Sequence, residues 1–419
     1  MHTHASPGTM LLALRPQIQE HLYDFYAELR SADDIFWDRR LDAWIATSHV
    51  VVSSAASDPR LSSVRYPDIE SVSEELRPLA RVLSRQMLYS DAPDHARLRA
   101  LLSRAFTPRA VATLRDQIRE AVDQIITKVA PTGRMDIVAD LARPLPLTII
   151  CDLLDVPEQD RLRLSSWSDP IAAAIGSSRL DADESRAASQ SMEHMLAYLR
   201  GLLTRREAPA AHTLRALLTT QAEDTSQDFD ELLANCALLL IAGHETTTHF
   251  IGNAALALLR NPHAADQLRH RPDLIPAAVE EFLRYDSPVQ LMLRRARHRL
   301  DLAGRVIDAG QVVLLVCGAA NRDPAAFPHP DELDFHRSGG RRHVAFGYGP
   351  HFCLGAALAR LEGTIVLEAL LTRLSDLRLE NCPLRWQRSL NFRGLTRLDV
   401  TFKPTFGDHS TFEAPSPSS

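Results

Sequence analysis

One cysteine of this 419-residue chain lies in a setting that suits a metal-bound thiolate. Cys353 stands near the end of the segment FGYGPHFCLG, residues 346–355, and a helical-looking segment follows. Gly347, Gly349 and Gly355 can adopt backbone angles that other residues avoid, and they let a flat ligand lie against bare main chain. The segment therefore predicts a loop that presents one sulfur atom toward a planar cofactor.

A thiolate at the N-terminal end of a helix is stabilised by the helix dipole and by unpaired N–H groups, which lower the pKa of the thiol. Such a thiolate is the axial ligand with which a haem iron cleaves an O–O bond, whereas His, Met and Tyr ligands serve other haem chemistries. The alternative is a buried structural cysteine in a glycine-rich turn, the usual role of an isolated cysteine. The fixed spacing Phe-Gly-x-Gly-x-His-x-Cys-x-Gly favours the haem ligand.

A second group of polar residues interrupts a long apolar segment, residues 233–259, that predicts a core helix. Ala242 and Thr246 are one helical turn apart, so a small side chain leaves room for dioxygen where a hydroxyl can donate to it. Glu245 beside Thr246 can relay protons from solvent. The alternative is that Thr246 and the two threonines after it bond back to carbonyls one turn earlier, a common use of buried threonine.

Two further pairs share a helix face. His95 and Arg99, at i and i+4, can bind one anionic group together, although such a pair usually marks a solvated face. Glu281 and Arg284, at i and i+3, are close enough to form an ion pair, which contributes little when it lies at a surface. The residue types alone leave both alternatives open.

In their order and separation, these segments resemble the cytochrome P450 family from about residue 17 to residue 403. The segment around Cys353 matches the haem-binding signature of the family at every fixed position, and residues 242–246 match its oxygen-binding element. The resemblance implies a mainly α fold with small β-sheets. In that fold the haem is held between the long oxygen-binding helix and the helix after the Cys353 loop.

The resemblance also implies roles for particular side chains. Contacts to haem are expected from His95, Arg99, Arg294, His351, Phe346, Gly347, Gly355 and Cys353, the last as axial ligand of the iron. The expected catalytic residues are Thr246, Glu245 and Ala242, and the expected structural clamp is Glu281, Arg284 and Arg337. The substrate pocket is expected to include Val289, Gln290, Leu291 and Met292. Arg295 leaves open whether it or Arg294 contacts a haem propionate.

The expected activity is that of a monooxygenase that inserts one oxygen atom from O2 into a lipophilic small molecule, by hydroxylation or epoxidation, in natural-product metabolism. The expected cofactor is haem b, and electrons come ultimately from NAD(P)H through a reductase and a separate ferredoxin or flavodoxin. The substrate is either free or bound to a carrier protein. Six arginines are expected to dock the electron carrier: Arg97, Arg104, Arg109, Arg341, Arg342 and Arg360.

Other functions share the Cys353 loop. A haem-thiolate peroxygenase or isomerase needs the same loop but usually dispenses with the pair Glu245 and Thr246, which is present here. A catalytically silent haem protein that recruits partners or senses gas is disfavoured by the same pair. A zinc or structural cysteine protein is disfavoured because the five cysteines lie far apart in the sequence.

Composition and length set the wider expectations. Hydrophobic residues make up 45% of the chain, enough for a large core, and a formal net charge of −6 without a run of basic residues gives no sign of nucleic-acid binding. Residues 1–30 contain no segment suited to a bilayer, so no membrane insertion is expected. The five widely spaced cysteines favour a reducing cytoplasm, and a monomer is expected.

The predicted organisation is a mobile segment over residues 1–16, a single haem-thiolate domain over 17–406 and a disordered tail over 407–419. No fused flavin or ferredoxin module is expected, because nothing outside the domain is long enough to form one. Apolar spacing predicts consecutive helices from residue 110 to 203. By position, residues 167–193 resemble the mobile lid helices of the family. Residues 305–307 and 311–316 bracket Asp308-Ala309-Gly310 and predict a β-hairpin.

Overall fold

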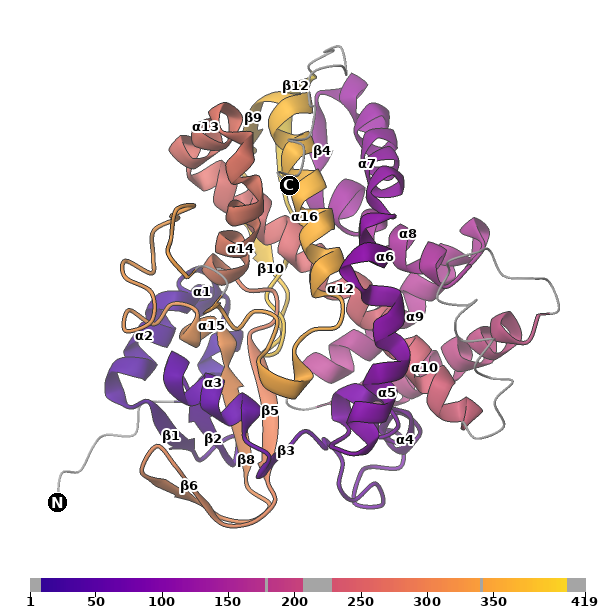
Figure 1. Ribbon diagram of the computed structural model, residues 1–419, viewed down its shortest axis with the longest axis vertical. Coiled ribbons are helices and arrows are strands. Elements are labelled where there is room, and N and C mark those ends of the chain that lie inside the picture. Colours follow the sequence, from indigo (N-terminus) through magenta and orange to yellow (C-terminus); the bar gives the residue numbers. More distant parts are fainter. Residues whose placement is uncertain (1–8, 178–179, 206–227, 340–341, 405–419) are drawn as a thin grey trace, which may run out of the picture.

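The computed structural model describes residues 9–177, 180–205, 228–339 and 342–404. Helices fill most of the molecule, and the largest sheet gathers at the lower left of Figure 1. The mainly α fold with small sheets expected from the sequence is confirmed. Residues 407–419, expected to form a disordered tail, lie outside the described residues.

The helices are α1 (Pro16–Glu20), α2 (Leu22–Ala32), α3 (His49–Ser57), α4 (Arg77–Leu83), α5 (Asp94–Ser103), α6 (Pro108–Ala112), α7 (Arg115–Val129), α8 (Pro144–Leu153), α9 (Arg161–Gly176), α10 (Ala182–Leu203), α12 (Phe229–Arg260), α13 (Pro262–His270), α14 (Ile275–Tyr285), α15 (Cys317–Ala320) and α16 (Ala356–Arg373). The consecutive helices α7 to α10 occupy the region where the sequence predicts them.

The strands are β1 (Ile35–Asp38), β2 (Ala43–Ala46), β3 (Leu61–Ser62), β4 (Arg134–Asp136), β5 (Leu291–Ala296), β6 (Leu300–Leu302), β7 (Arg305–Ile307), β8 (Val312–Val316), β9 (Leu374–Leu379), β10 (Arg385–Trp386), β11 (Leu395–Arg397) and β12 (Asp399–Pro404). In the part of the chain that the structure describes, the largest sheet has the order β1-β2-β8-β5-β3, with β2 and β8 parallel. A three-stranded sheet has the order β4-β12-β9.

The predicted hairpin between residues 305–307 and 311–316 is wrong, although both segments are strands. β7 pairs with β6, because Ala303 and Gly304 form a two-residue turn with φ angles of +50° and +75° that suits an antiparallel pair. β8 is apolar along its whole length, and it lies between β2 and β5 in the centre of the largest sheet. A strand with apolar side chains on both faces is most stable where both faces are covered.

α12 is the central helix, and it is buried along nearly its whole length. The Asp228 side chain caps its first turn by accepting from the Asp230 N–H, and Arg260 carries positive charge in its last turn. Its sides contact α8, α10, α14 and α16. A helix that is apolar on all sides belongs in a core, which explains why α12 runs through the middle of the fold.

The ordered chain begins earlier than the sequence predicts. Residues 9–16, expected to be mobile, form a short 3-10 helix and the start of α1. Met10 is fully buried, and Thr9 Oγ1 donates to an Asp38 carboxylate oxygen at 2.8 Å. A buried apolar side chain next to a satisfied buried carboxylate anchors this segment to β1. The remaining residues of the predicted mobile segment, 1–8, lie outside the described residues.

Candidate functional site

A cavity of about 330 Å³ is lined by residues of both α12 and α16. The α12 side includes Ala242, Gly243 and Thr246, and the α16 side includes Leu358 and Glu362. The loop before α16 contributes Cys353 to the same wall. The two segments that the sequence singled out for chemistry therefore face one space.

Cys353 is exposed to this space, and its loop is fixed by the main chain. The Cys353 N–H donates to the Phe346 carbonyl at 2.8 Å, and Gly347 takes a φ of +72°, which only glycine adopts without strain. Gly349 has the same φ and lies so close to α3 that a Cβ there would sit 2.6 Å from Ser57 Oγ. Glycine at these two positions lets the loop turn sharply and approach α3.

The pKa of the Cys353 thiol lies above its usual value, because burial outweighs the hydrogen bond at Gly355 and the charges of Arg99 and Arg360. The prediction of a lowered pKa is therefore wrong for Cys353 surrounded by protein alone. The helix-dipole argument leaves out the cost of removing the thiolate from water. A metal ion deprotonates a coordinating thiol outright, so the raised pKa does not oppose metal ligation.

A cluster of basic side chains lies along one part of the cavity wall. His95 and Arg99 lie on α5, Arg294 on β5 and His351 in the Cys353 loop, and all four line the cavity. The His95 and His351 rings lie 4.0 Å apart, and His351 Nε2 lies 3.0 Å from Ser63 Oγ. Burial, together with the nearby charges of Arg294 and His95, lowers the pKa of His351 to about 3.

Arg294, rather than Arg295, points to this space. The Arg294 side chain is buried and lines the cavity, whereas Arg295 does not line it and donates through Nη1 to the Gly310 carbonyl at 2.7 Å. Arg294 Nη1 donates only to the neighbouring Leu293 carbonyl, and Nη2 has no hydrogen-bond partner among the described residues. The alternation of side chains along β5 separates the two arginines.

The residues present fit a haem. Among the described residues, neither Arg99 nor Arg294 forms an ion pair with a carboxylate, so both retain donors for carboxylates from outside the chain. A Cβ on Gly355 would meet no protein atom within 4 Å, which leaves room beside the cysteine loop. Apolar walls, unpaired cations at one edge and a thiol match a flat apolar ring that carries two carboxylates and a metal.

The structure shows the back-bonding arrangement at two of the three α12 threonines, whereas Thr248 Oγ1 donates to the Ala142 carbonyl at 3.0 Å. Thr246 Oγ1 donates to the Ala242 carbonyl at 2.9 Å, and Thr247 Oγ1 donates to the Gly243 carbonyl at 3.2 Å, so both hydroxyls bond back one turn. Ala242 and Thr246 nevertheless line the cavity. A hydroxyl that donates to a carbonyl still accepts, so Thr246 retains polar capacity toward the cavity.

Glu245 is a buried carboxylate between two imidazoles. Its Oε1 lies 3.2 Å from His244 Nε2, and its Oε2 lies 3.8 Å from His249 Nε2. Burial alone would raise the pKa of Glu245, but His244, His249 and Arg143 lower it to about 2. Arg143 is partly exposed and pairs with Asp169, so this group of charges reaches toward the surface.

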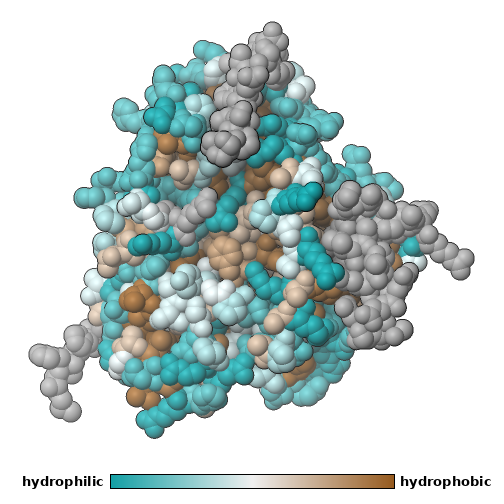
Figure 2. All heavy atoms as spheres, in the orientation of Figure 1, coloured by the Kyte–Doolittle hydropathy of each residue, from teal (hydrophilic) through white to brown (hydrophobic). Residues whose placement is uncertain are grey.

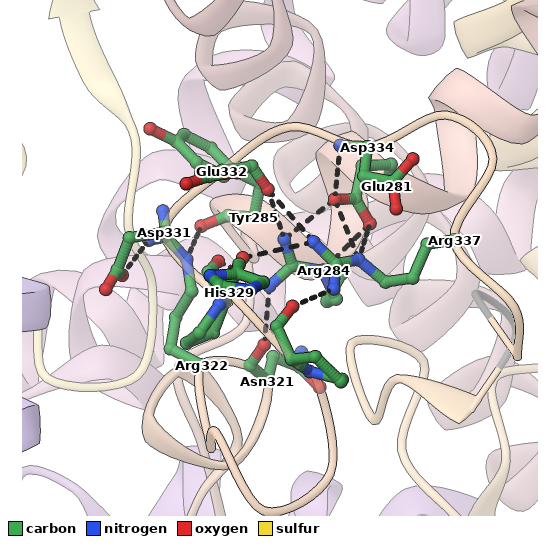
Figure 3. Close-up of polar contacts among 12 residues, drawn as sticks. Glu281, Arg284, Tyr285, Asn321, Arg322, His329, Asp331, Glu332, Asp334 and Arg337 are labelled. Atoms are coloured by element: carbon green, nitrogen blue, oxygen red, sulfur yellow. Dashed lines mark hydrogen bonds and ion pairs between the residues drawn. The ribbon is translucent and has the colours of Figure 1, made fainter.

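Glu281, Arg284 and Arg337 come together as a fully paired cluster, drawn in Figure 3. Arg284 Nε and Nη2 each donate to a Glu281 oxygen at 2.8 Å, and Arg337 Nε donates to Glu281 Oε1 at 3.1 Å. The Asp334 N–H donates to the same carboxylate, and Arg284 Nη1 donates to the Asn321 carbonyl. These bonds tie α14 to the segment that leads into the Cys353 loop.

Three of the four residues predicted for the substrate pocket lie on the cavity wall: Val289, Leu291 and Met292. Gln290 does not, and the prediction for it is wrong. Its side chain turns away, and Nε2 donates to the Ser287 carbonyl at 2.7 Å and to Tyr23 Oη at 3.4 Å. The segment is extended, so neighbouring side chains point to opposite sides, and a buried amide turns to the side that offers partners.

The sequence reasoning missed a second ion cluster that supports the loop. Glu280 Oε2 lies 3.1 Å from His343 Nε2 and accepts from Arg360 Nη2 at 3.0 Å, which joins α14, the cysteine loop and α16. Burial opposes the charge on Glu280, yet these partners lower its pKa to about 2. Glu280 and Glu281 are adjacent in the sequence, but their side chains point in different directions from α14, so each carboxylate belongs to a different cluster.

The six arginines expected to dock an electron carrier are not equivalent. Arg97 is paired with Glu231 at 2.7 Å and Arg360 is paired with Glu280, so both are neutralised within the chain. Arg104, Arg109 and Arg342 are exposed. Arg341 lies outside the described residues. On the face shown in Figure 2, hydrophilic residues predominate around a central group of hydrophobic ones.

In the described part of the chain, no helix has both the length and the apolar character required to cross a membrane. No group of three or more His, Cys, Asp or Glu side chains is arranged to hold a metal ion among those residues. None of the five cysteines, all of which the structure describes, forms a disulfide.

Comparison with known proteins gives consistent matches. A family model described as cytochrome P450 matches residues 175–384. The chain is 37% identical over 383 residues to "Biotin biosynthesis cytochrome P450" of Bacillus subtilis (strain 168), with 91% of this chain and 96% of that protein covered. It is 38% identical over 412 residues to "Cytochrome P450 monooxygenase PikC" of Streptomyces venezuelae, with 96% of each covered.

A solved structure extends these matches to three dimensions. The crystal structure of P450BioI in complex with an acyl carrier protein ligated to hexadec-9Z-enoic acid has a TM-score of 0.87 to this structure and 36% sequence identity. The similarity covers 92% of this chain and 100% of that chain. The likeness therefore spans nearly the whole length of both proteins.

Proposed function

The chain belongs to the cytochrome P450 family, and we propose that Cys353 is the axial ligand of haem b in a monooxygenase that acts on a lipophilic small molecule. The observation that carries this proposal is the position of the Cys353 thiol on the wall of one cavity shared with Ala242 and Thr246 of α12. Thiolate-ligated haem supplies cleavage of the O–O bond, with electrons delivered by a separate redox partner.

The basic residues of the cavity would bind the haem carboxylates. Arg99 and Arg294 supply guanidinium donors that no carboxylate of the described chain uses, and His95 and His351 lie beside them. Charge-assisted hydrogen bonds from such groups are roughly twice as strong as neutral ones. This arrangement would fix the orientation of the haem relative to α12.

The α12 residues would control oxygen access and proton movement. Ala242 leaves space on the cavity wall, and the Thr246 hydroxyl retains polar capacity there. Glu245 lies between His244 and His249 and also lines the cavity, so it would pass protons between these imidazoles and the cavity. The surrounding core excludes bulk water from the step.

The apolar character of the cavity supports a lipophilic substrate in natural-product metabolism. Leu238, Leu239, Val289, Leu291 and Phe392 line it, and they favour burial of hydrocarbon surface. Haem b and the reductant NAD(P)H are inferred from family membership. Unpaired cysteines favour a reducing cytoplasm as the location.

We infer that the exposed arginines dock an acidic ferredoxin or flavodoxin. Arg104 lies shortly before α6, and Arg109 lies in α6, which contacts α16. Arg342 lies in the segment before the Cys353 loop. Replacement of Arg109 and Arg342 by Glu is expected to slow reduction by such a carrier, most strongly at low salt. Stopped-flow reduction rates measured across a salt series check this, and unchanged rates would refute the docking surface.

The decisive test is the absorption spectrum of the purified protein after reduction with dithionite and addition of carbon monoxide. The wild-type protein is expected to show the strongly red-shifted Soret band of thiolate-ligated haem, and Cys353→His is expected to lose it. Cys382→Ala is a matched control, because Cys382 is half-buried and lies outside the cavity wall. Absence of haem, or a band unaffected by Cys353→His, would overturn the assignment.

A further inference from the structure

Arg65 is a charged residue of the cavity wall that lies apart from the predicted haem contacts in the sequence. It lies in the loop after β3, and its guanidinium faces the carboxyl end of α9. Its Nη2 donates to the Ile175 carbonyl at 3.1 Å, and its Nε lies 3.3 Å from Tyr66 Oη. These contacts do not use all the N–H donors of this permanently charged side chain.

Arg65 has no acidic partner among the described residues, where its hydrogen bonds go to the Ile175 carbonyl and to the phenols Tyr66 and Tyr89. Many other arginines of the chain pair with a carboxylate, as Arg97 does with Glu231. A half-buried cation without an anion retains the capacity to bind one from a ligand. This imbalance is the kind of feature that marks a binding position.

Two further polar side chains of the cavity wall lie close to Arg65. Asn391 Nδ2 donates to the same Ile175 carbonyl at 2.9 Å. Tyr89 is half-buried beside the guanidinium, and desolvation raises the pKa of its phenol, so the hydroxyl stays protonated and able to donate. We call Arg65, Tyr89 and Asn391 the arginine corner; all three line the cavity, whose wall is otherwise largely apolar.

The arginine corner is separate from the basic cluster expected to hold the haem. In the basic cluster, the His95 and His351 rings lie 4.0 Å apart, and His351 Nε2 lies 3.0 Å from Ser63 Oγ. Arg65 instead is anchored on α9, and Asn391 belongs to the segment between β10 and β11. The cavity therefore has two cationic positions, one beside the cysteine loop and one at the end of α9.

We propose that the arginine corner binds a free carboxylate of the substrate, so that the substrates of this enzyme are lipophilic carboxylic acids rather than neutral lipids or thioesters. The inference rests on the proposed function and names the substrate class of the same site. Arg65 provides the charge, and Tyr89 and Asn391 supply polar groups beside it. A carboxylate held at the end of α9 leaves the hydrocarbon part of the molecule along the apolar wall.

The test compares dodecanoic acid with methyl dodecanoate, which have the same hydrocarbon chain and differ in charge. Binding to the haem-loaded protein is measured by calorimetry and by the Soret shift, without turnover. The wild type is expected to bind the acid more tightly than the ester. Arg65→Gln is expected to weaken acid binding about tenfold or more while changing ester binding less than about twofold, because one charge-assisted contact is lost.

Two variants serve as controls. Arg65→Lys retains the charge and is expected to keep part of the preference for the acid. Arg299→Gln removes an arginine whose side chain is 74% exposed and lies outside the cavity wall, and it is expected to bind both probes as the wild type does.

Each other outcome contradicts the proposal. Equal loss of acid and ester affinity in Arg65→Gln would make Arg65 only a bridge between its loop and α9. Faster haem release from Arg65→Gln, comparable to that from Arg294→Gln, would assign Arg65 to a haem carboxylate. Equal affinity of the wild type for acid and ester, or no binding of the acid, would leave the corner without a carboxylate ligand. If the red-shifted carbon monoxide band were absent, the proposed function would fail separately.

Discussion

The clamp and the cavity wall both contain a buried arginine, and the two arginines differ in whether their N–H donors have partners. At the clamp, Arg284 is completely buried and every side of its guanidinium meets Glu281 or a main-chain carbonyl (Figure 3). On the cavity wall, Arg294 is also buried, yet its Nη2 has no partner among the described residues. Two similar side chains therefore differ in whether the chain itself satisfies them.

This difference separates structure from binding. Burial of a charge is tolerated when hydrogen bonds and an opposite charge compensate the loss of water. The clamp meets that condition by itself, so its role is complete within the chain. The cavity arginines do not meet it with the described residues alone, which is why we propose that they bind the carboxylates of a ligand.

The largest expected effect comes from breaking the clamp. Glu281→Ala would leave Arg284 as a buried, uncompensated charge and is expected to lower the free energy of unfolding by about 3–5 kcal/mol. Denaturant unfolding measures this. The control is Arg271→Gln, which removes an exposed pair with Asp273 and is expected to cause no measurable change. A small effect for Glu281→Ala would remove the distinction between the two regions.

Glu245 is intermediate between the fully paired clamp and the incompletely paired Arg294, because it is a buried acid whose partners are imidazoles. Glu245→Gln keeps the shape but removes the carboxylate, and it is expected to slow substrate-dependent oxygen consumption about a hundredfold, the usual scale for loss of a proton-transfer group. Glu368→Gln serves as the control, because Glu368 lies on α16 away from the cavity wall. An unchanged rate, with an unchanged solvent isotope effect, would exclude Glu245 from proton transfer.

Arg294→Gln tests the role of the cavity arginine that has an unpaired N–H donor. It is expected to accelerate haem transfer to an acceptor protein by about tenfold or more, because a charge-assisted contact to a carboxylate is lost. Unlike the clamp variant, it is expected to leave the stability of the haem-free protein unchanged or improved, since an uncompensated charge is removed. A loss of stability as large as that for Glu281→Ala would show that Arg294 is structural.

The last expected effect appears only below neutral pH and is a pH dependence from His249. Its ring is buried, neither nitrogen has a hydrogen-bond partner in the described part of the chain, and burial with the charges of Arg143 and His244 lowers its pKa to about 4, against the opposing effect of Glu245. Since the unfolded state binds the proton first, stability is expected to fall as the pH decreases from about 6.5 to about 4, by up to about 1.4 kcal/mol per pH unit.

His249→Gln is expected to flatten that slope, as measured by denaturant unfolding at several pH values. His270→Gln, at an exposed position on α13, is expected to leave the slope unchanged. If both variants kept the wild-type slope, protonation of His249 would not contribute to the loss of stability in acid.

Much of the site could be predicted because its spacing is local. His95 and Arg99, Ala242 and Thr246, and Glu281 and Arg284 are each brought together by a single helix, so helical periodicity alone fixes their relation. The glycines around Cys353 similarly prescribe the loop through backbone freedom. Arg337 lies 56 residues from Glu281, and only the resemblance to a family linked it to the clamp.

Long-range packing decided what local spacing could not. The direction of Gln290, the choice between Arg294 and Arg295, the partners of β7 and β8 and the neutralisation of Arg97 all depend on which element lies alongside. The same holds for Glu280 and for Arg65, which meet their partners across large sequence separations. Nothing in the neighbouring residues indicates these contacts.

The sequence by itself determined the chemistry of this protein: one thiol in a glycine-rich loop, an acid and an alcohol on a core helix, and a mainly helical chain to hold them. The tertiary structure decided which charges are satisfied and which remain available to a ligand. The physical reason is that residue type and periodicity act over one or two turns, whereas burial and charge compensation depend on atoms that distant segments bring into contact.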